Sequence, residues 1–261
     1  MTEAVVLGTI DDRGVATATL NRPEVHNAYN GEVVGLLAEY LMAWAVDDAV
    51  RLVVIRANGK HFQAGADLGW LKEVSGADWP TNLKVSVDTT NAMRGLYLYP
   101  KPTVAVIQGA CYGGGTGIAA SCDVVVASDD AKFCISEVKW GVMPGPIIPQ
   151  LNRAIGERNV RRYALSSEPF DATEALRIGM AHEVAPRADL DAAAEKVISA
   201  ILACGPDGVA KTKAVSIEMA GGFPEDLAAR LAEQHARKRI SDEASEGLNS
   251  FLEKRKASWI P

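Results

Sequence analysis

No two cysteines of this 261-residue chain have C-x-x-C spacing, and no histidines have the H-E-x-x-H spacing of a metal-binding helix. No G-x-S-x-G segment marks a nucleophilic serine, and no cysteine has a histidine partner in a recognisable motif. The residues of both types are dispersed, as Cys111, Cys122, Cys134 and Cys204, and His26, His61, His182 and His235. We therefore expect no metal, no covalent intermediate and a reduced, cytoplasmic protein whose histidines are structural or at the surface.

Basic residues are neither abundant nor clustered. The 27 Lys and Arg are outnumbered by 33 Asp and Glu, which gives a formal net charge of −6. This balance argues against nucleic acid or an anionic membrane surface as a partner. The apolar runs are shorter than the roughly 20 residues that span a membrane, and Met1 to Ala4 lack the basic start of a signal peptide. We expect a small-molecule partner and no membrane segment.

Strand-like and helical segments alternate through the first two-thirds of the chain. Residues 5–10 and 15–20 favour a hairpin, because Asp11, Asp12 and Gly14 between them suit a chain reversal. Further strands are expected at residues 52–57, 103–107 and 124–127, and helices at residues 33–44, 67–74 and 83–97. The nearly continuous apolar character of these strands is typical of a parallel sheet covered on both faces. The predicted fold class is α/β.

The composition changes near Asp189. Beyond it the strand signal disappears, and Ala-, Leu-, Glu- and Lys-rich helical periodicity continues to Phe251. Gly205-Pro206 and residues 221–224 divide this stretch into three expected helices. We therefore predict a core carrying the active site over residues 1–188 and a helical region over residues 189–261, packed on the core or on another subunit.

Two small-residue turns follow predicted strands and precede predicted helices. One is Ala64-Gly65-Ala66-Asp67 and the other is Gly113-Gly114-Gly115. Turns after neighbouring parallel strands meet at the same edge of the sheet, where ligands bind. Helix N-termini present unpaired N–H groups and the positive end of the helix dipole. Two of them converging would hold a developing oxyanion, which indicates catalysis on a carbonyl, although a lone triple glycine can equally be a packing turn.

The second turn overlaps a dinucleotide-binding pattern. Residues 115–120 fit G-x-G-x-x-A after a strand, and Asp129 or Asp130 could then contact a ribose. The acidic pair follows the pattern much sooner than the usual interval of about 20 residues. The spacing therefore favours the oxyanion interpretation.

Glu137 stands in an otherwise apolar stretch, Phe133 to Val138. Burial raises the pKa of a carboxyl group toward neutrality and so suits it to proton transfer at working pH. A capping or salt-bridged glutamate is the alternative interpretation.

These residues together resemble the enoyl-CoA hydratase/isomerase, or crotonase, superfamily. The shared segments are Asn21-Arg22-Pro23, Asn27-Ala28, Phe62 to Asp67, Gly113-Gly114-Gly115, Cys122-Asp123, Glu137, Gly141 to Pro144, and Phe251 to Lys256. Three segments look most similar to bacterial methylglutaconyl-CoA hydratases and their isohexenyl relatives: Ala66 to Leu71, Phe133 to Val138 and Ala154 to Arg158.

The resemblance implies a crotonase-like spiral of ββα units, with a C-terminal helical region that forms trimers or hexamers. It implies that the amides of Ala66 and Gly114 hold the thioester oxygen while Glu137 transfers protons. No cofactor is consumed, since coenzyme A is part of the acyl-CoA substrate. The positions expected to bind substrate or coenzyme A are His26, Ala28, Ala64, Asp67, Leu68, Gly113, Gly117, Phe251 and Lys254, the last two commonly acting from a neighbouring subunit.

Gly117 departs from the family pattern, because well-known hydratases carry a second glutamate at this position. A lyase that hydrates an α,β-unsaturated, branched or glutaconyl-type acyl-CoA remains the preferred interpretation. A double-bond isomerase with one glutamate, a hydrolase or C–C cleaving enzyme, and a non-catalytic acyl-CoA binder are the alternatives. We also expect the missing side chain to free volume beside the β-carbon for a branched acyl group.

Overall fold

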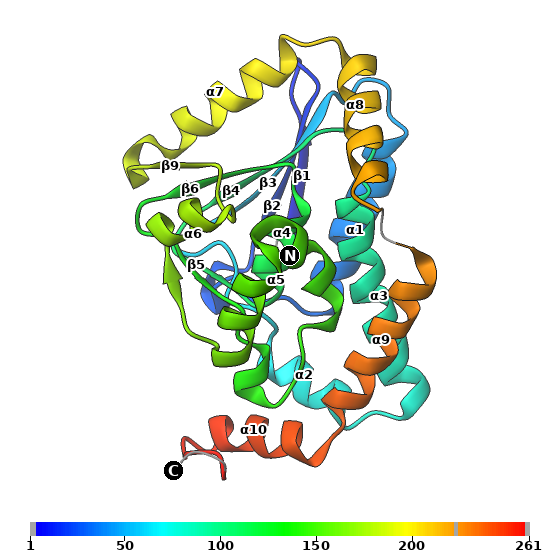
Figure 1. Ribbon diagram of the computed structural model, residues 1–261, viewed down its shortest axis with the longest axis vertical. Helices are drawn as coiled ribbons and strands as arrows, with labels where there is room; N and C mark the ends of the chain where they lie inside the picture. Colours follow the sequence, from blue (N-terminus) through cyan, green and yellow to red (C-terminus); the bar gives the residue numbers. More distant parts are fainter. Residues whose placement is uncertain (1–3, 222–223, 259–261) are drawn as a thin grey trace.

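The computed structural model describes residues 4–221 and 224–258 and contains a six-stranded main sheet (Figure 1). Its strand order is β1-β2-β3-β4-β6-β9. All neighbours are parallel except the hairpin of β1 and β2. The strands are β1 (Val6–Ile10), β2 (Val15–Leu20), β3 (Leu52–Ala57), β4 (Thr103–Ile107), β6 (Val124–Ser128) and β9 (Glu183–Ala185). The predicted hairpin and parallel strands are confirmed.

A second sheet of three short strands lies beside the main one. It has the order β5-β7-β8, with β5 parallel and β8 antiparallel to β7. The strands are β5 (Ala110–Tyr112), β7 (Lys132–Cys134) and β8 (Phe170–Asp171). This sheet was not predicted. Its strands have at most three residues each, which is too short for a two-residue periodicity to be recognised.

Both faces of the main sheet are covered, as the apolar strands predicted. Along β3, Val53 and Ile55 belong to the larger hydrophobic core, whereas Val54 belongs to a second cluster on the opposite face. Helix α7 (Leu190–Leu202) closes that opposite face with Leu190 and Ala194. The other helices of the α/β unit are α1 (Gly31–Ala45), α2 (Leu68–Ser75), α3 (Trp79–Tyr97), α4 (Gly114–Ser121), α5 (Ile148–Ser166) and α6 (Ala172–Ile178). The predicted α/β class is confirmed.

Four short 3₁₀ turns complete this part of the chain and place loops around one end of the sheet. They are η1 (Pro23–Val25), η2 (Glu137–Trp140), η3 (Gly145–Ile147) and η4 (Arg187–Asp189). The last leads directly into α7. The boundary expected after residue 188 therefore falls within η4, and α7 belongs to the packed core.

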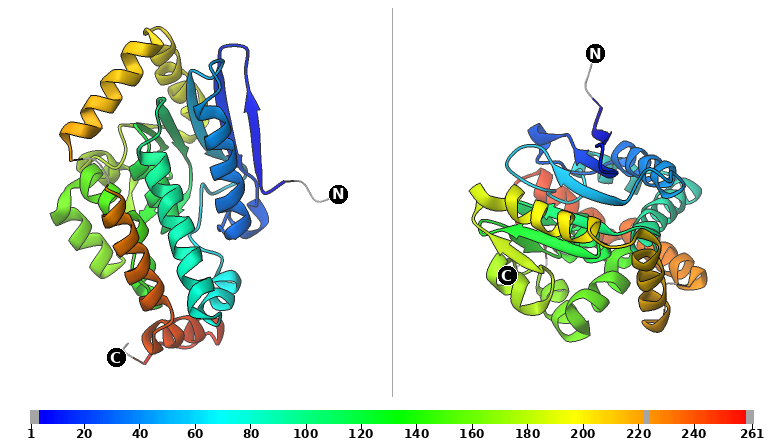
Figure 2. Two further views of the ribbon diagram at one scale, coloured as in Figure 1. Left: turned by 90° about the vertical axis from the view of Figure 1, so that its right-hand side faces the viewer. Right: turned by 90° about the horizontal axis from the view of Figure 1, so that it is seen from above.

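The chain after α7 forms α8 (Pro206–Met219), α9 (Glu225–Arg239) and α10 (Asp242–Leu252). The described part beyond residue 189 thus has four helices, and the prediction of three is wrong. The missed break lies at Ile240 and Ser241, where the Ser241 side chain accepts from the amide of Ala244 and starts α10. Helix α9 runs along α3 (Figures 1 and 2), so this region packs on the core. A role in trimer formation stays a prediction.

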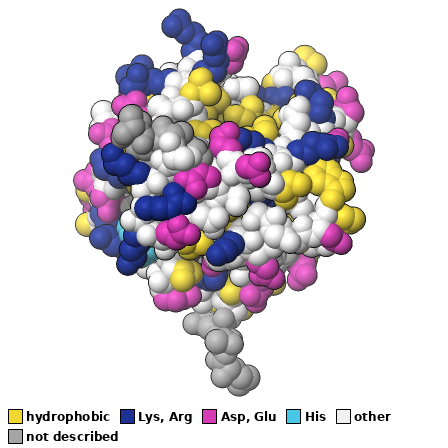
Figure 3. Space-filling view, turned by 90° about the horizontal axis from the view of Figure 1, so that it is seen from below, with side chains coloured by type: hydrophobic (Ala, Val, Ile, Leu, Met, Phe, Trp, Pro, Cys, Tyr) yellow, Lys and Arg dark blue, Asp and Glu magenta, His cyan; other side chains and the backbone are white. Residues whose placement is uncertain are grey.

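The face seen from below carries interspersed basic and acidic side chains, with hydrophobic ones between them (Figure 3). No single sign of charge dominates this view. Within residues 4–221 and 224–258, none of the helices is sufficiently long and apolar to cross a membrane.

Candidate active site

The two small-residue turns adjoin in space. Gly65 and Gly113 have φ of 93° and 50°, values that favour glycine. A Cβ placed on Gly113 would lie 3.5 Å from the Cα of Gly65 and 3.2 Å from Oε1 of Glu137. The turn before α2, the turn before α4 and the carboxyl of Glu137 are therefore neighbours, as the sequence predicted.

Two backbone amides at these turns have no acceptor in the described part of the chain. Tyr29 forms an isolated parallel bridge with Ala66. The amide of Tyr29 donates to the carbonyl of Gly65, and the amide of Asp67 donates to the carbonyl of Tyr29. This pattern leaves the Ala66 N–H unused. Gly114 is the first residue of α4, where the helix offers its N–H no acceptor. Both amides are available to a ligand.

Glu137 is the first residue of η2, and its carboxyl group has an unusual pKa. Its Oε2 is buried and has no hydrogen-bond partner among the described residues. Burial raises the pKa of the carboxyl to about 7, while the amides of Glu137 and Ser136 act in the opposite direction. The group can therefore exchange a proton near neutral pH. None of the described Lys, Arg or His side chains forms a salt bridge with Glu137, which contradicts the salt-bridged alternative.

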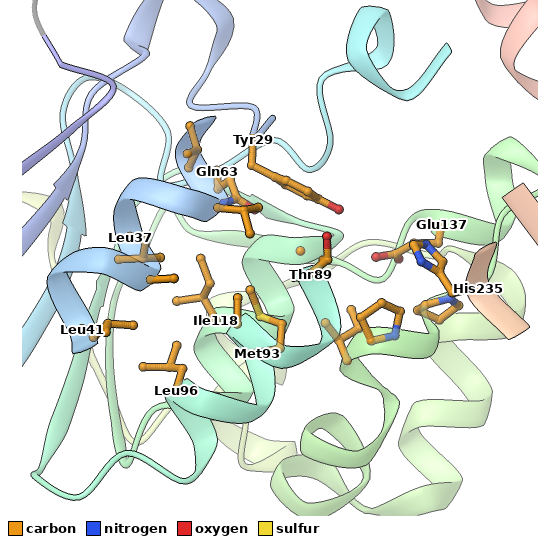
Figure 4. A pocket seen from close by; sticks show the side chains of 18 of the residues that line it. Tyr29, Leu37, Leu41, Gln63, Thr89, Met93, Leu96, Ile118, Glu137 and His235 are labelled. Atoms are coloured by element: carbon orange, nitrogen blue, oxygen red, sulfur yellow. The ribbon is translucent and has the colours of Figure 1, made fainter. Parts of the chain in front are cut away.

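A central cavity surrounds these groups and shares four lining residues with a small apolar pocket, which we call the tunnel. The central cavity is lined by both turns, Glu137, Trp140, Val142 and Phe251. The tunnel lies between α1 and α3 and is lined mainly by Val33, Leu37, Leu41, Met93, Leu96 and Ile118. Tyr29, Gly114, Glu137 and His235 line both spaces. Figure 4 shows Tyr29, Glu137 and His235 at one end of the tunnel, with Leu41 and Leu96 toward the other.

Most residues predicted to bind substrate line the central cavity. They are His26, Ala28, Ala64, Ala66, Asp67, Leu68, Gly113, Gly114 and Phe251. Asp67 has a structural role as well, because Oδ1 accepts from the amides of Gly69 and Trp70 and Oδ2 lies 3.1 Å from Nη2 of Arg22. Lys254 does not line the cavity of its own chain.

The loop that carries His26 and Ala28 is held by a buried side chain. His26 and Asn27 both have φ of 56°. Asn27 is 2% exposed, accepts from the amide of Arg22 at 2.7 Å and donates to the carbonyls of Asn58 and His61 at 2.9 and 2.8 Å. These bonds fix the left-handed backbone beside the cavity.

Gly117 does not leave free space. It lies inside α4 rather than on the cavity wall, and a Cβ placed there would lie 2.2 Å from Cγ2 of Ile147 and 3.4 Å from Sδ of Met93. The expectation that Gly117 makes room for a branched acyl group is therefore wrong, because Ile147 fills the position. The dinucleotide interpretation is wrong too, since residues 115–120 lie within this buried helix and Asp130 pairs with Arg187.

The comparisons with known proteins agree with this geometry. A family model described as "Enoyl-CoA hydratase/isomerase" matches residues 11–260. The chain belongs to the enoyl-CoA hydratase/isomerase family. It is 30% identical to a short-chain-enoyl-CoA hydratase of Clostridium acetobutylicum, over 93% of this chain and 92% of that protein. It is also 30% identical to a trans-2-decenoyl-[acyl-carrier-protein] isomerase of Streptococcus mutans, over 95% of each chain.

A crystal structure of an enoyl-CoA hydratase from Shewanella pealeana has the same fold. Its TM-score to this chain is 0.79 at 37% identity, covering 98% of this chain and 96% of that one. The chain is thus an enzyme of the enoyl-CoA hydratase/isomerase family. Relatives of this chain are named for both hydration and isomerisation.

Several residues that border the site of this hydratase/isomerase family member were not predicted to do so. Tyr29, Gln63, His235 and Arg239 line the tunnel or the central cavity, and His235 is buried. Burial and the neighbouring guanidinium of Arg239 lower the pKa of His235 to about 3. His235 and Arg239 are four residues apart on one face of α9. That spacing is visible in the sequence, but nothing there shows that this face is directed toward Glu137.

Proposed function

We propose that the chain is a hydro-lyase that adds water to the double bond of an α,β-unsaturated acyl-CoA. The amides of Ala66 and Gly114 would donate hydrogen bonds to the thioester oxygen, and Glu137 would transfer the protons. The observation that carries this proposal is the carboxyl of Glu137, whose pKa is about 7 and whose Oε2 has no partner among the described residues. It lies beside two amides that the described chain leaves unused, at the head of an apolar tunnel. Coenzyme A enters as part of the substrate and no cofactor is consumed.

The reaction balances with a single carboxyl. Glu137 accepts a proton from water while the water oxygen bonds to the β-carbon and the electrons of the double bond move to the thioester oxygen. The two amides stabilise the resulting enolate, and loss of one such donor typically costs roughly 10²- to 10³-fold in rate. Glu137 then returns the proton to the α-carbon, which gives a hydroxyacyl-CoA.

The acyl group is proposed to carry a branch or tail that enters the apolar tunnel. Leu37, Leu41 and Leu96 line the tunnel and would bury such a chain favourably. A glutaconyl-type acyl group adds a carboxylate, which would need a cation outside the tunnel, since no Lys or Arg is among the described residues that line the tunnel.

Isomerisation is the second candidate, because Ile147 occupies the space where a second carboxyl would stand. In that reaction Glu137 would take a proton from the α-carbon of a β,γ-unsaturated thioester and return it to the γ-carbon. Hydrolysis would use the same two amides but would release a free acid and coenzyme A, whereas C–C cleavage would leave a shorter acyl-CoA.

The deciding experiment is incubation with conjugated and β,γ-unsaturated acyl-CoAs in heavy-oxygen water, followed by mass analysis. Hydration predicts a product heavier by one labelled water. An unchanged mass with a moved double bond would refute hydration and establish isomerisation. Saturable binding without any product would identify a non-catalytic acyl-CoA binder.

We also propose that the chain forms homotrimers, singly or stacked in pairs, in which Phe251 and Lys254 help to hold coenzyme A of a neighbouring copy. Phe251 is 46% exposed and contacts Trp140 edge to face at 4.6 Å. Light scattering after size-exclusion chromatography tests this proposal, and a monomer at micromolar concentration would contradict it.

A further inference from the structure

Arg239, the last residue of α9, is a buried cation without an anionic partner. It is 2% exposed. Nε donates to Oδ1 of Asn82 at 2.7 Å, and Nη2 donates to the Asn82 carbonyl at 2.7 Å and to Oγ of Ser86 at 2.8 Å. All three acceptors are neutral, and none of the described carboxylates forms an ion pair with the guanidinium. Buried charges are normally paired, because removing an ion from water is costly.

The guanidinium borders the central cavity that contains Ala66, Gly114 and Glu137. Its Nη1 donates to none of the described residues. Burial lowers the pKa of Arg239 to about 10, so the group is still positively charged at neutral pH. Burial raises the pKa of the Tyr29 hydroxyl, Glu137 raises it further, and Arg239 lowers it. A positive charge and a proton-transferring carboxyl therefore face the same enclosed space.

His235, one helical turn before Arg239, supplies a second donor. Its Nδ1 lies 3.2 Å from Oγ of Ser86. Because Ser86 Oγ already accepts from Arg239, its own hydrogen is free to go to Nδ1 of the neutral imidazole. The ring hydrogen then resides on Nε2, for which the described residues provide no acceptor. Figure 4 shows the His235 ring beside Glu137.

The geometry points to Arg239, assisted by His235, as the binding site for a second carboxylate carried by the acyl group of the substrate. This inference rests on the proposed acyl-CoA activity and narrows its substrate class to enoyl-CoA thioesters of dicarboxylic acids. The apolar tunnel and the Arg239 side of the central cavity meet at Tyr29, Gly114 and Glu137. A branched glutaconyl-type group fits both, with its apolar branch in the tunnel and its carboxylate at Arg239.

The reason for the arrangement is electrostatic complementarity. Asn82 and Ser86 orient the guanidinium but leave its charge uncompensated, so a carboxylate that enters the cavity restores the missing partner. A neutral acyl group of the same size leaves the charge unpaired. Discrimination between the two ligands should be large, because losing one member of a desolvated charge pair typically weakens binding by roughly 30-fold or more.

The test compares two saturated, unreactive ligands, β-methylglutaryl-CoA and β-methylvaleryl-CoA, which differ in a terminal carboxylate or methyl group. Isothermal titration calorimetry should show the parent binding the first at least 30-fold more tightly. Equal affinities of the parent for the two ligands would overturn the inference without any variant.

Variants separate the charge from the packing role of Arg239. Arg239→Met should abolish the preference and leave the affinity for β-methylvaleryl-CoA within about threefold, whereas Arg239→Lys should keep part of the preference. Lys238→Met is the matched control, since it removes a neighbouring cation of α9 that pairs with Glu243. Lys238→Met should keep the full preference for β-methylglutaryl-CoA. Loss of this preference in Lys238→Met would refute the assignment to Arg239. If Arg239→Met does not fold, the parent comparison and Arg239→Lys still decide.

The outcomes also separate this inference from the proposed function, because both ligands are inert. A strong carboxylate preference without labelled-oxygen incorporation would contradict hydration and support the carboxylate site. Hydration with equal affinity for the two ligands would do the reverse. Failure to bind either ligand would contradict both proposals.

Discussion

Replacing Glu137 by glutamine should stabilise the protein at alkaline pH while it removes activity. The pKa of this carboxyl rises from 4.5 to about 7 on folding, and a shift of that size corresponds to roughly 3 kcal/mol. The folded state holds the proton more tightly than the unfolded state, so the cost of ionisation is absent below pH 4.5. The destabilisation of the folded state by this ionisation grows between pH 4.5 and 7 and reaches its full value above pH 7. The neutral amide of Glu137→Gln avoids it.

Urea unfolding at pH 5 and pH 8 measures this effect. We expect Glu137→Gln to exceed the parent in free energy of unfolding by about 3 kcal/mol at pH 8 and by about 1 kcal/mol at pH 5. Glu218→Gln, which changes an exposed carboxylate on α8, is the matched control and should show no such difference. An equal stability of parent and Glu137→Gln at pH 8 would show that the carboxyl is not desolvated.

The Glu137→Gln variant also tests the role of this carboxyl in catalysis, and the pKa of Glu137 sets the pH dependence of the rate. Glu137→Gln should lower kcat/KM by roughly 10²- to 10⁴-fold. The ionised carboxyl starts both hydration and isomerisation, so kcat/KM of the parent should rise with pH through about 7. Activity of Glu137→Gln close to that of the parent, or a profile that is flat from pH 5 to 8, would remove this residue from the mechanism.

Three other changes test the packing around the site. Gly117→Ala should lower the free energy of unfolding by roughly 1–3 kcal/mol because its Cβ meets Ile147. Combined with Ile147→Ala, it should cost less in urea unfolding than the sum of the two single losses. Ala92→Phe should narrow the tunnel and reduce kcat/KM for long enoyl-CoAs far more than for crotonyl-CoA; equal reductions would contradict the tunnel assignment. His235 has a pKa of about 3, so its own contribution to parent stability should fall by up to about 5 kcal/mol between pH 6.5 and 3, as the unfolded state gains a proton. His235→Gln should flatten that decline, and an unchanged slope would be evidence against a buried neutral ring.

The sequence predicted the main sheet well because its strands are continuous apolar runs bounded by polar or turn residues. β3 and β4 begin and end where expected, and the two glycine turns and Glu137 come together as inferred. The three strands of the second sheet could not be predicted in this way. Phe133 of β7, for example, is buried by pairing with Phe170, a partner that lies far along the chain.

His235 and Arg239 also depend on contacts between segments that lie far apart in the sequence. His235 and Arg239 are about a hundred residues beyond Glu137 and reach the cavity only because α9 packs along α3. The interpretation of Gly117 failed for a related reason. A position without a side chain predicts a void only if no neighbour fills it, and Ile147 does so from η3.

The loop held by Asn27 has a consequence for the kinetics of ligand capture. Its left-handed residues are held by three hydrogen bonds of the Asn27 side chain to the protein's own backbone. The conformational entropy of ordering this loop is therefore lost during folding and not on association. A ligand meeting His26 and Ala28 encounters a preorganised surface, so its capture should follow simple one-step kinetics without a slow rearrangement of the loop.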